Sequence, residues 1–588
     1  MFIFSHCLPD QYNNNLFPIK VLSHPQTPPF FTKPFPGTFK LKKNFLFSII
    51  SPYWEQSVIK NFYGIFLSST IGFFCSRKWQ KNCTALYYIM KELFFLFNNQ
   101  RKQEYAIMAD NYNVYLNPLT DRYASAEMSY NWSPQKKHST WRRLWLALAE
   151  AEHELGLAIS QEQIEEMRGH LDDIDFEAVA KKEAELRHDV MSHIHVFGSQ
   201  CPQAMPIIHL GATSCYVTDN TELIQMRDGL KLVRGKMLKL FDNLAKFALE
   251  YKDMPTLGFT HYQPAQLTTV GKRFCLYLQD FMLDFERLEN ELANMPFRSV
   301  KGTTGTQASF LELFDGDHTK VRTLEKRVAE KMGFDKIIPV SGQTYTRKVD
   351  YYVLTLLAGI AQSAYKMAGD IRLLANLREI EEPFGKKQIG SSAMAYKRNP
   401  MRSERVCSLA RYVMDLPVNA AHTHATQWFE RTLDDSANRR LVLPEAFLGI
   451  DVILSLLINI TDGLQVWPAV IAKRVAAELP FMATENILME AVKAGGDRQE
   501  LHEAIRVNSM EAARMIKTEG ADNDLLIRLK ADPAFAKVAD RIDSLVDPKK
   551  FVGRAPEQTE EFIREHISPI LAMYDHELNG TSVDSVNV

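Results

Sequence analysis

The segment from Gly390 to Glu404 carries a dense set of side chains that could do chemistry. It reads Gly-Ser-Ser-Ala-Met-Ala-Tyr-Lys-Arg-Asn-Pro-Met-Arg-Ser-Glu. Its hydroxyls, lysine and amide are hydrogen-bonding groups, its glycine gives the backbone freedom, and its proline stiffens the exit. A mobile loop that carries a nucleophile or a base, followed by cations, suits chemistry on a carboxylate-bearing substrate. The alternative is a polar surface loop before a helix.

A second polar motif, Thr256–Gln266, contains His261 in the order Thr-Leu-Gly-Phe-Thr-His-Tyr-Gln-Pro-Ala-Gln. Histidine is the side chain best matched to proton transfer near neutral pH, although a lone histidine is more often structural. We therefore consider His261 a candidate for proton transfer.

Four further segments could bind anions. Arg187-His188-Asp189 and Gly211-Ala212-Thr213-Ser214 combine charges and hydroxyls, but each could also be an ordinary helix end or helix N-cap. The planar side chain of arginine binds two anion oxygens at once, so two Arg-containing segments are candidate anion sites, although either could be a surface salt-bridge network. Their residues are Arg122 and Tyr123 in one segment, and Arg431, Ser436 and Arg440 in the other.

The 390–404 segment resembles the signature of the fumarase/aspartase superfamily, a set of lyases that eliminate fumarate. From Tyr396 onward it is similar to adenylosuccinate lyases, except that Ala395 stands where that family usually has proline. The resemblance implies that Ser391 is the base and His261 the proton donor, although Ser392 could be argued from the residues alone. A serine base needs its alkoxide stabilised, by Lys397 or by backbone donors.

The resemblance also implies which residues contact the substrate: Arg122, Tyr123, Arg187, His188, Asp189, Thr213, Ser214, Gln343, Lys397, Asn399, Arg405, Arg431, Ser436 and Arg440. Among these, it implies that the segments with Arg122 and with Arg431, Ser436 and Arg440 bind a phosphate of the substrate. It implies cleavage of adenylosuccinate to AMP and fumarate, and of the succinylated aminoimidazole carboxamide ribotide (SAICAR) to AICAR, without a metal or organic cofactor. It further implies a cytoplasmic homotetramer with active sites shared between subunits, and no nucleic-acid or membrane partner.

Two alternatives remain. One is another fumarate-releasing lyase, such as argininosuccinate lyase, and the two arginine clusters argue against it because its substrate has no phosphate. The other is a catalytically inactive helical scaffold, and the joint presence of Ser391, His261, Lys397 and both clusters argues against that.

The elements that position these residues are predicted to be long helices. Apolar residues recur every three or four positions from Thr140 to Leu155, with Gly156 as a stop, and in four longer runs. These runs are 223–247, 274–292, 352–374 and 441–460. Strand-like alternation is almost absent, and no glycine-rich nucleotide motif occurs. The pattern predicts an all-α bundle. The resemblance implies three helical regions, at 108–213, 214–466 and 467–588.

Residues 1–107 differ in composition from the rest. They hold 16 of the 35 Phe. They also hold 12 Lys and Arg against 4 Asp and Glu, a net charge of +8, and because the whole chain has a net charge of −2, the remainder has −10. The apolar stretch 62–75 is shorter than the ~20 residues that span a bilayer. Three interpretations are open: a spurious upstream extension of the reading frame, a targeting or membrane-surface segment, or a true small domain. We favour the first and expect poor order and dispensability. The seven scattered cysteines predict reduced thiols.

Overall fold

The structure is a computed structural model that describes residues 113–385 and 387–581. The chain divides into two units, Met1–Asn113 and Val114–Val588. The predicted extension 1–107 lies outside the described residues, so the expectations about it stay predictions. Everything below concerns the second unit.

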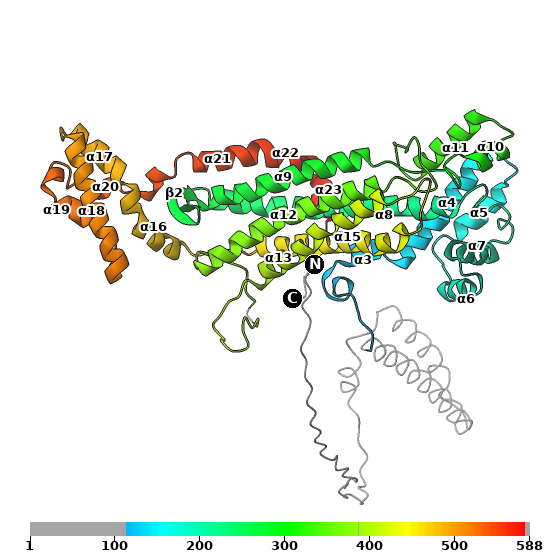
Figure 1. Ribbon diagram of the computed structural model, residues 1–588, viewed down its shortest axis with the longest axis horizontal. Helices are drawn as coiled ribbons and strands as arrows, with labels where there is room; N and C mark the ends of the chain where they lie inside the picture. Colours follow the sequence, from blue (N-terminus) through cyan, green and yellow to red (C-terminus); the bar gives the residue numbers. More distant parts are fainter. Residues whose placement is uncertain (1–112, 386, 582–588) are drawn as a thin grey trace, which may run out of the picture. The chain divides into compact units, whose positions relative to one another are not determined.

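This unit is helical, and the predicted all-α fold is confirmed (Figure 1). Its centre consists of long helices that lie side by side: α8 (Ser214–Glu250), α9 (Val270–Asn294), α12 (Lys348–Asn376), α13 (Met401–Asp415) and α15 (Asp435–Thr461). All four longer runs of apolar spacing fall inside helices of this bundle. The shorter run coincides with α4 (Pro134–Glu154), which Gly156 follows at a φ of 93°.

Smaller helices cover the two ends of the bundle. Before α8 come η1 (Leu119–Tyr123), α3 (Ala126–Asn131), α4, α5 (Gln161–Gly169), α6 (Phe176–Leu186) and α7 (Asp189–Gln200). Three more lie between the long helices: α10 (Ala308–Leu313), α11 (His318–Lys331) and α14 (Pro417–Ala425). Figure 1 shows α4–α7, α10 and α11 at one end of the long helices.

The chain after α15 forms two structures. The helices α16 (Pro468–Met482), α17 (Thr484–Lys493), α18 (Arg498–Glu519), α19 (Leu525–Ala531) and α20 (Ile542–Leu545), with the short η2 (Pro533–Phe535) and η3 (Pro548–Phe551), surround a small apolar core at the other end of the bundle (Figure 1). The chain then returns along α8 and α9 as α21 (Ala555–Phe562), η4 (Ile563–Ile567), α22 (Ser568–Met573) and α23 (Asp575–Gly580).

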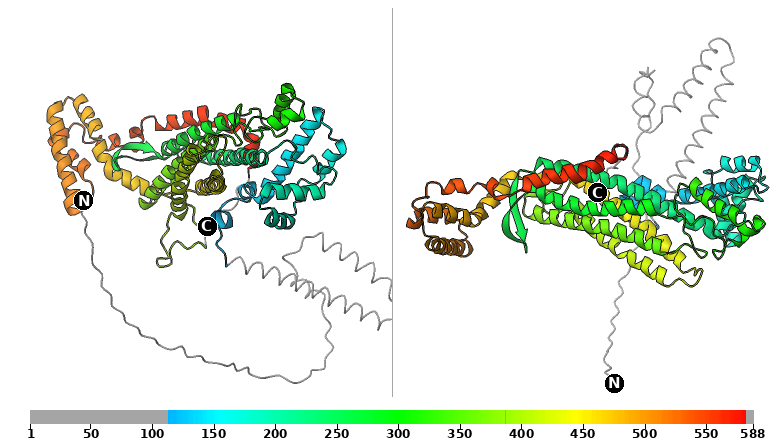
Figure 2. Two further views of the ribbon diagram at one scale, coloured as in Figure 1. Left: turned by 45° about the vertical axis from the view of Figure 1, so that its right-hand side comes forward. Right: turned by 90° about the horizontal axis from the view of Figure 1, so that it is seen from above.

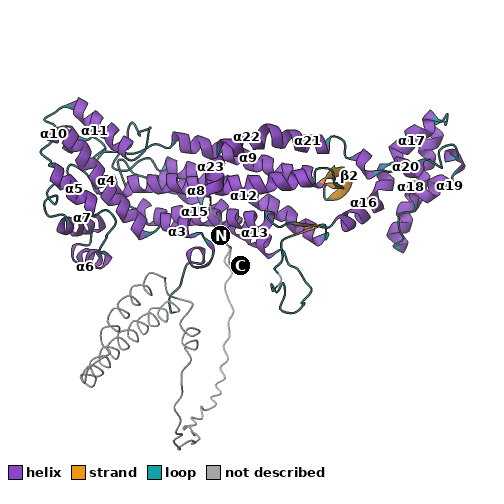
Figure 3. Ribbon diagram, turned by 180° about the vertical axis from the view of Figure 1, so that it is seen from behind, coloured by secondary structure: helices purple, strands orange, loops and turns teal. Residues whose placement is uncertain are grey.

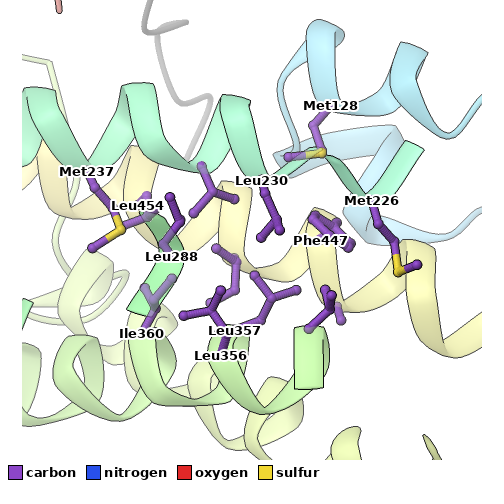
Figure 4. Close-up of a cluster of buried hydrophobic side chains, with 14 of the residues drawn as sticks. Met128, Met226, Leu230, Met237, Leu288, Leu356, Leu357, Ile360, Phe447 and Leu454 are labelled. Atoms are coloured by element: carbon purple, nitrogen blue, oxygen red, sulfur yellow. The ribbon is translucent and has the colours of Figure 1, made fainter. Parts of the chain in front are cut away.

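The main core lies where the long helices meet. Figure 4 shows Leu230 of α8, Leu288 of α9, Leu356 of α12 and Phe447 of α15 pointing toward one another, and all four are buried. Burying one such side chain stabilises the fold by roughly 1.5–3 kcal/mol. The helix α15 is apolar enough to span a membrane, but 83% of its most apolar window is buried inside the structure. It is therefore the central helix of the bundle.

The motif around His261 forms a hairpin that the sequence pattern did not predict. Strands β1 (Pro255–Thr260) and β2 (Gln263–Thr269) pair antiparallel, with Thr260 opposite Gln263. His261 and Tyr262 occupy the turn with φ values of 54° and 58°. Two consecutive left-handed residues are the geometry of a tight two-residue hairpin turn. Two further short strands, β3 (Ile380–Glu381) and β4 (Gln465–Val466), also pair.

Glu152 of α4 is a fully buried acid, and its two carboxylate oxygens have no hydrogen-bond partner among the described residues. Burial raises its pKa from 4.5 to about 9. The folded protein therefore keeps a proton that the unfolded chain releases, so this group's contribution to stability is complete below pH 4.5 and is lost as the pH rises toward 9.

We expect Glu152→Gln, which is neutral at every pH, to raise the free energy of unfolding by roughly 3 kcal/mol at about pH 7. Urea unfolding at about pH 5 and about pH 8 checks this, because the variant should gain mainly at the higher pH. Equal effects at both values would mean that the carboxyl does not titrate as its burial requires.

Candidate active site

A polar cleft of about 710 Å³ lies where α8 and α15 begin, beside the junction of α6 and α7. It brings together half of the predicted substrate contacts, although they are distant in sequence: Arg187, His188, Asp189, Ser214, Arg431, Ser436 and Arg440 line it. Four of these residues carry a positive charge or a hydroxyl and come from the 431–440 segment and the start of α8, so the cleft can bind an anion. They are Arg431, Ser436, Arg440 and Ser214.

The Arg187-His188-Asp189 motif forms the junction between α6 and α7. Arg187 ends α6 in the left-handed region, with a φ of 52°, and His188 is the N-cap of α7. The Nδ1 atom of His188 accepts a hydrogen bond from the backbone N–H of Met191 at 3.3 Å. The motif is thus a helix end, as one interpretation held, and the sharp junction also holds the three side chains at the cleft.

Thr213 and Gln343, two other predicted contacts, are linked to the cleft through Arg431. The Nη1 of Arg431 donates to Oε1 of Gln343 at 3.0 Å, and Nε2 of Gln343 donates to Oγ1 of Thr213 at 3.3 Å. Thr213 is the N-cap residue of α8 but makes no side-chain cap, so its hydroxyl is used by Gln343. Elsewhere in the cleft, Nη2 of Arg440 lies 3.4 Å from Oδ2 of Asp189.

The floor of the cleft is a network of buried charges that sequence reasoning missed. Arg347, directly before α12, binds Asp219 of α8 at 3.2 Å and Asp435 of α15 at 2.7 Å. Arg439 of α15 binds Asp350 of α12 at 2.7 Å. All five side chains are buried, and the network holds the first turns of three long helices together. Acids within helices that are otherwise apolar are the signal that could have identified them.

The loop that carries Ser391 connects β3 to α13 and folds back on itself. The Oγ of Ser391 accepts hydrogen bonds from the backbone N–H groups of Ala393 at 3.3 Å and Met394 at 3.1 Å. Asn399 Nδ2 donates to the carbonyl of Gly390 at 2.8 Å, and a Cβ at Gly390 would stand 2.0 Å from the carbonyl oxygen of Lys397. Two backbone N–H groups therefore point at the Oγ of Ser391. At Gly390 a larger residue would collide with the backbone of Lys397.

Arg122, Tyr123 and Arg405 gather at a different place, beside α15 and α13. The guanidinium of Arg405 lies 4.9 Å from the ring centroid of Tyr123, and that of Arg122 lies 5.6 Å from it. None of the three lines the cleft. His261 is exposed at the tip of the β1–β2 hairpin.

Within one chain, the structure does not bring Ser391 and His261 to the cleft. Ser214 begins α8 and the hairpin follows its end, and 37 helical residues span about 55 Å. Ser391 follows the far end of α12, whose 29 residues start beside Arg347 and span about 44 Å. Figures 2 and 3 show the hairpin at the end of the bundle opposite α6 and α7. Within 113–385 and 387–581, no group of acids, histidines and cysteines could hold a metal ion.

Solved structures with this fold include a 3-carboxy-cis,cis-muconate lactonizing enzyme from Pseudomonas putida and a fumarate lyase from Mesorhizobium sp. BNC1. The first has a TM-score of 0.67 at 22% identity and covers 76% of this chain and 99% of its own. The second has a TM-score of 0.65 at 22% identity and covers 77% of this chain and 100% of its own. These likenesses establish the fold alone.

Sequence similarity is more specific. Residues 125–415 match the family described as Lyase, and residues 480–562 match the one described as Adenylosuccinate lyase C-terminus. Adenylosuccinate lyases from Saccharomyces cerevisiae and Schizosaccharomyces pombe are each 55% identical to the chain. The alignments cover 80% and 81% of this chain and 99% of each relative. With the fold, the 390–404 signature and near-complete coverage of these relatives in agreement, the chain belongs to the adenylosuccinate lyase family of the fumarase/aspartase superfamily.

Proposed function

We infer that the protein is an adenylosuccinate lyase, which cleaves adenylosuccinate to AMP and fumarate. The observation that carries this conclusion is the 55% identity to two adenylosuccinate lyases over 99% of their length. The cleft is consistent with it, because its lining includes arginines and hydroxyls that suit phosphate and carboxylate groups.

In the proposed reaction, the Ser391 alkoxide removes a proton from the carbon beside a succinyl carboxylate. The electron pair left on that carbon forms the double bond of fumarate as the carbon–nitrogen bond breaks, and His261 donates a proton to the departing nitrogen. The two backbone N–H groups that already point at Oγ of Ser391 support this role, because they would stabilise a negative charge there. Lys397 and Asn399 lie in the same loop and would bind the substrate.

We propose that the enzyme is a homotetramer in which each active site uses more than one subunit. The separation within one chain supports this: the cleft, the Ser391 loop, the hairpin and the Arg122–Arg405 cluster are four different places. A partner chain would bring a second copy of the loop and the hairpin to each cleft. The cluster of Arg122, Tyr123 and Arg405 would then complete a phosphate site from a neighbouring subunit.

We further propose that SAICAR is a second substrate, that no cofactor takes part, and that the enzyme acts in the cytoplasm. The reaction needs only an acid, a base and donors for the carbanion, so the side chains named above are sufficient for it. A reducing compartment suits the four cysteines of the described part, which are free and buried: Cys201, Cys215, Cys275 and Cys407.

The test is fumarate release from adenylosuccinate by the purified protein, with SAICAR and argininosuccinate as parallel substrates and with a chelator in a duplicate series. We expect release from adenylosuccinate and SAICAR, unaffected by the chelator. Release from argininosuccinate alone would favour the related lyase, and release from none of the three would overturn the conclusion. Light scattering of the same sample measures whether the assembly has the mass of four chains.

A further inference from the structure

Lys137 is a cation of the cleft that makes no ion pair with a described residue. It lies in the first turn of α4, lines the cleft, and is half-buried. Its Nζ stands 5.4 Å from the ring centroid of Trp141, which is itself fully buried. Among the described residues, no carboxylate lies within ion-pair distance of this ammonium. The aromatic ring thus supports the side chain, while the charge faces the cleft.

Most other cations of the cleft already have polar partners. Arg347 and Arg439 bind buried acids, Arg440 lies 3.4 Å from Asp189, and Arg431 binds Gln343. Neutralising those arginines would therefore disturb the protein itself. Lys137 differs, because its ammonium has only the Trp141 ring and remains available to an incoming anion.

The electrostatic surroundings of Lys137 leave its positive charge only partly compensated. Burial lowers the pKa of Lys137 from its ordinary value, and Arg440 lowers it further, whereas the carboxylates of Glu222, Asp189 and Glu183 raise it. Those carboxylates offset part of the effect of burial without making an ion pair with Lys137. An anionic ligand would add to their effect, since a nearby negative charge favours the ammonium.

We propose that Lys137 is a substrate-binding residue that contacts the phosphate of the nucleotide. The proposal rests on the proposed function and assigns a role to a side chain beyond the family signature. The phosphate is favoured over the carboxylates because Lys137 shares the cleft with Arg431, Ser436 and Arg440, and Arg440 is among its electrostatic neighbours. A lysine binds phosphate as a compact point charge.

The test compares Lys137→Met with Lys136→Met, a matched control on the adjacent residue. Lys136 makes an ion pair with Asp228 at 2.9 Å and does not line the cleft. Each protein is assayed for KM with adenylosuccinate, and for inhibition by AMP and by adenosine, which lacks the phosphate. For Lys137→Met we expect KM and the AMP inhibition constant to rise about tenfold or more, the loss typical of one hydrogen bond to a charged group. The adenosine constant should stay unchanged.

Lys137→Arg should keep most of the affinity for AMP, because it retains the charge, and Lys136→Met should resemble the wild type. Equal losses for AMP and adenosine, or no loss for AMP, would overturn the role assigned to Lys137. Calorimetric titration of the same variants with AMP measures this step without turnover. A wild-type protein that binds AMP but releases no fumarate would contradict the proposed function and leave the Lys137 result interpretable.

Discussion

Replacement of Ser391 by alanine is expected to lower kcat by about 10²–10⁴-fold, the contribution of a general base. The substitution removes the oxygen to which the N–H groups of Ala393 and Met394 donate, and with it the proton acceptor. Ser392→Ala is the matched control, because Ser392 is adjacent and exposed and makes no hydrogen bond through its side chain to any described residue. We expect its rate to be near that of the wild type.

Fumarate release under saturating substrate measures both variants, and light scattering confirms that their assemblies are intact. A mixture of Ser391→Ala with His261→Gln tests in addition whether different subunits supply the two groups. If they do, subunit exchange should create some sites with both side chains intact, and activity should reappear. A normal rate for Ser391→Ala, with a lost rate for Ser392→Ala, would reverse the assignment of the base.

Arg347→Met is expected to lower the free energy of unfolding by about 3–5 kcal/mol, the cost of removing one partner from a buried ion pair. The side chain is 2% exposed, and its loss leaves the carboxylates of Asp219 and Asp435 buried without their cation. These acids lie one turn from Ser214 and directly before Ser436, so the walls of the cleft should also shift. We therefore expect KM for adenylosuccinate to rise together with the loss of stability.

Urea unfolding measures the first effect, and substrate titration below the unfolding range measures the second. Arg506→Met is the control, since Arg506 makes an ion pair with Glu503 on the exposed face of α18 and should give no measurable change. A stable Arg347→Met protein would show that the two acids find other partners or protonate. In that case the network would not be what holds the three helix starts together.

The long helices and the reactive segments could be predicted from the sequence because both depend on residues that are close in the chain. Apolar spacing over 441–460 identified the core of α15, and a single proline within it, Pro444, did not end the helix. The order of groups from Gly390 to Glu404 identified the segment that resembles the superfamily signature. The grouping of Arg187–Asp189 with Arg431–Arg440 followed from the resemblance, and the cleft brings the two segments together.

Tertiary structure alone decided which residues share a place. Arg347, Asp219 and Asp435 are ordinary charged residues in the sequence, and only the convergence of three helix starts turns them into a buried network. The residues around His261 do not show the alternation of apolar and polar side chains that would predict strands. The hairpin there is stabilised by the pairing of β1 with β2. Likewise, Lys136 and Lys137 are adjacent residues of the same type, and the sequence does not distinguish them. Because their side chains leave α4 in different directions, Lys136 makes an ion pair with Asp228, whereas Lys137 lines the cleft. Local spacing determines the helices, whereas contacts between distant segments determine the sites. A rigid helix such as α8, about 55 Å long, holds the residues at its two ends apart, so each end forms a site with other segments of the chain.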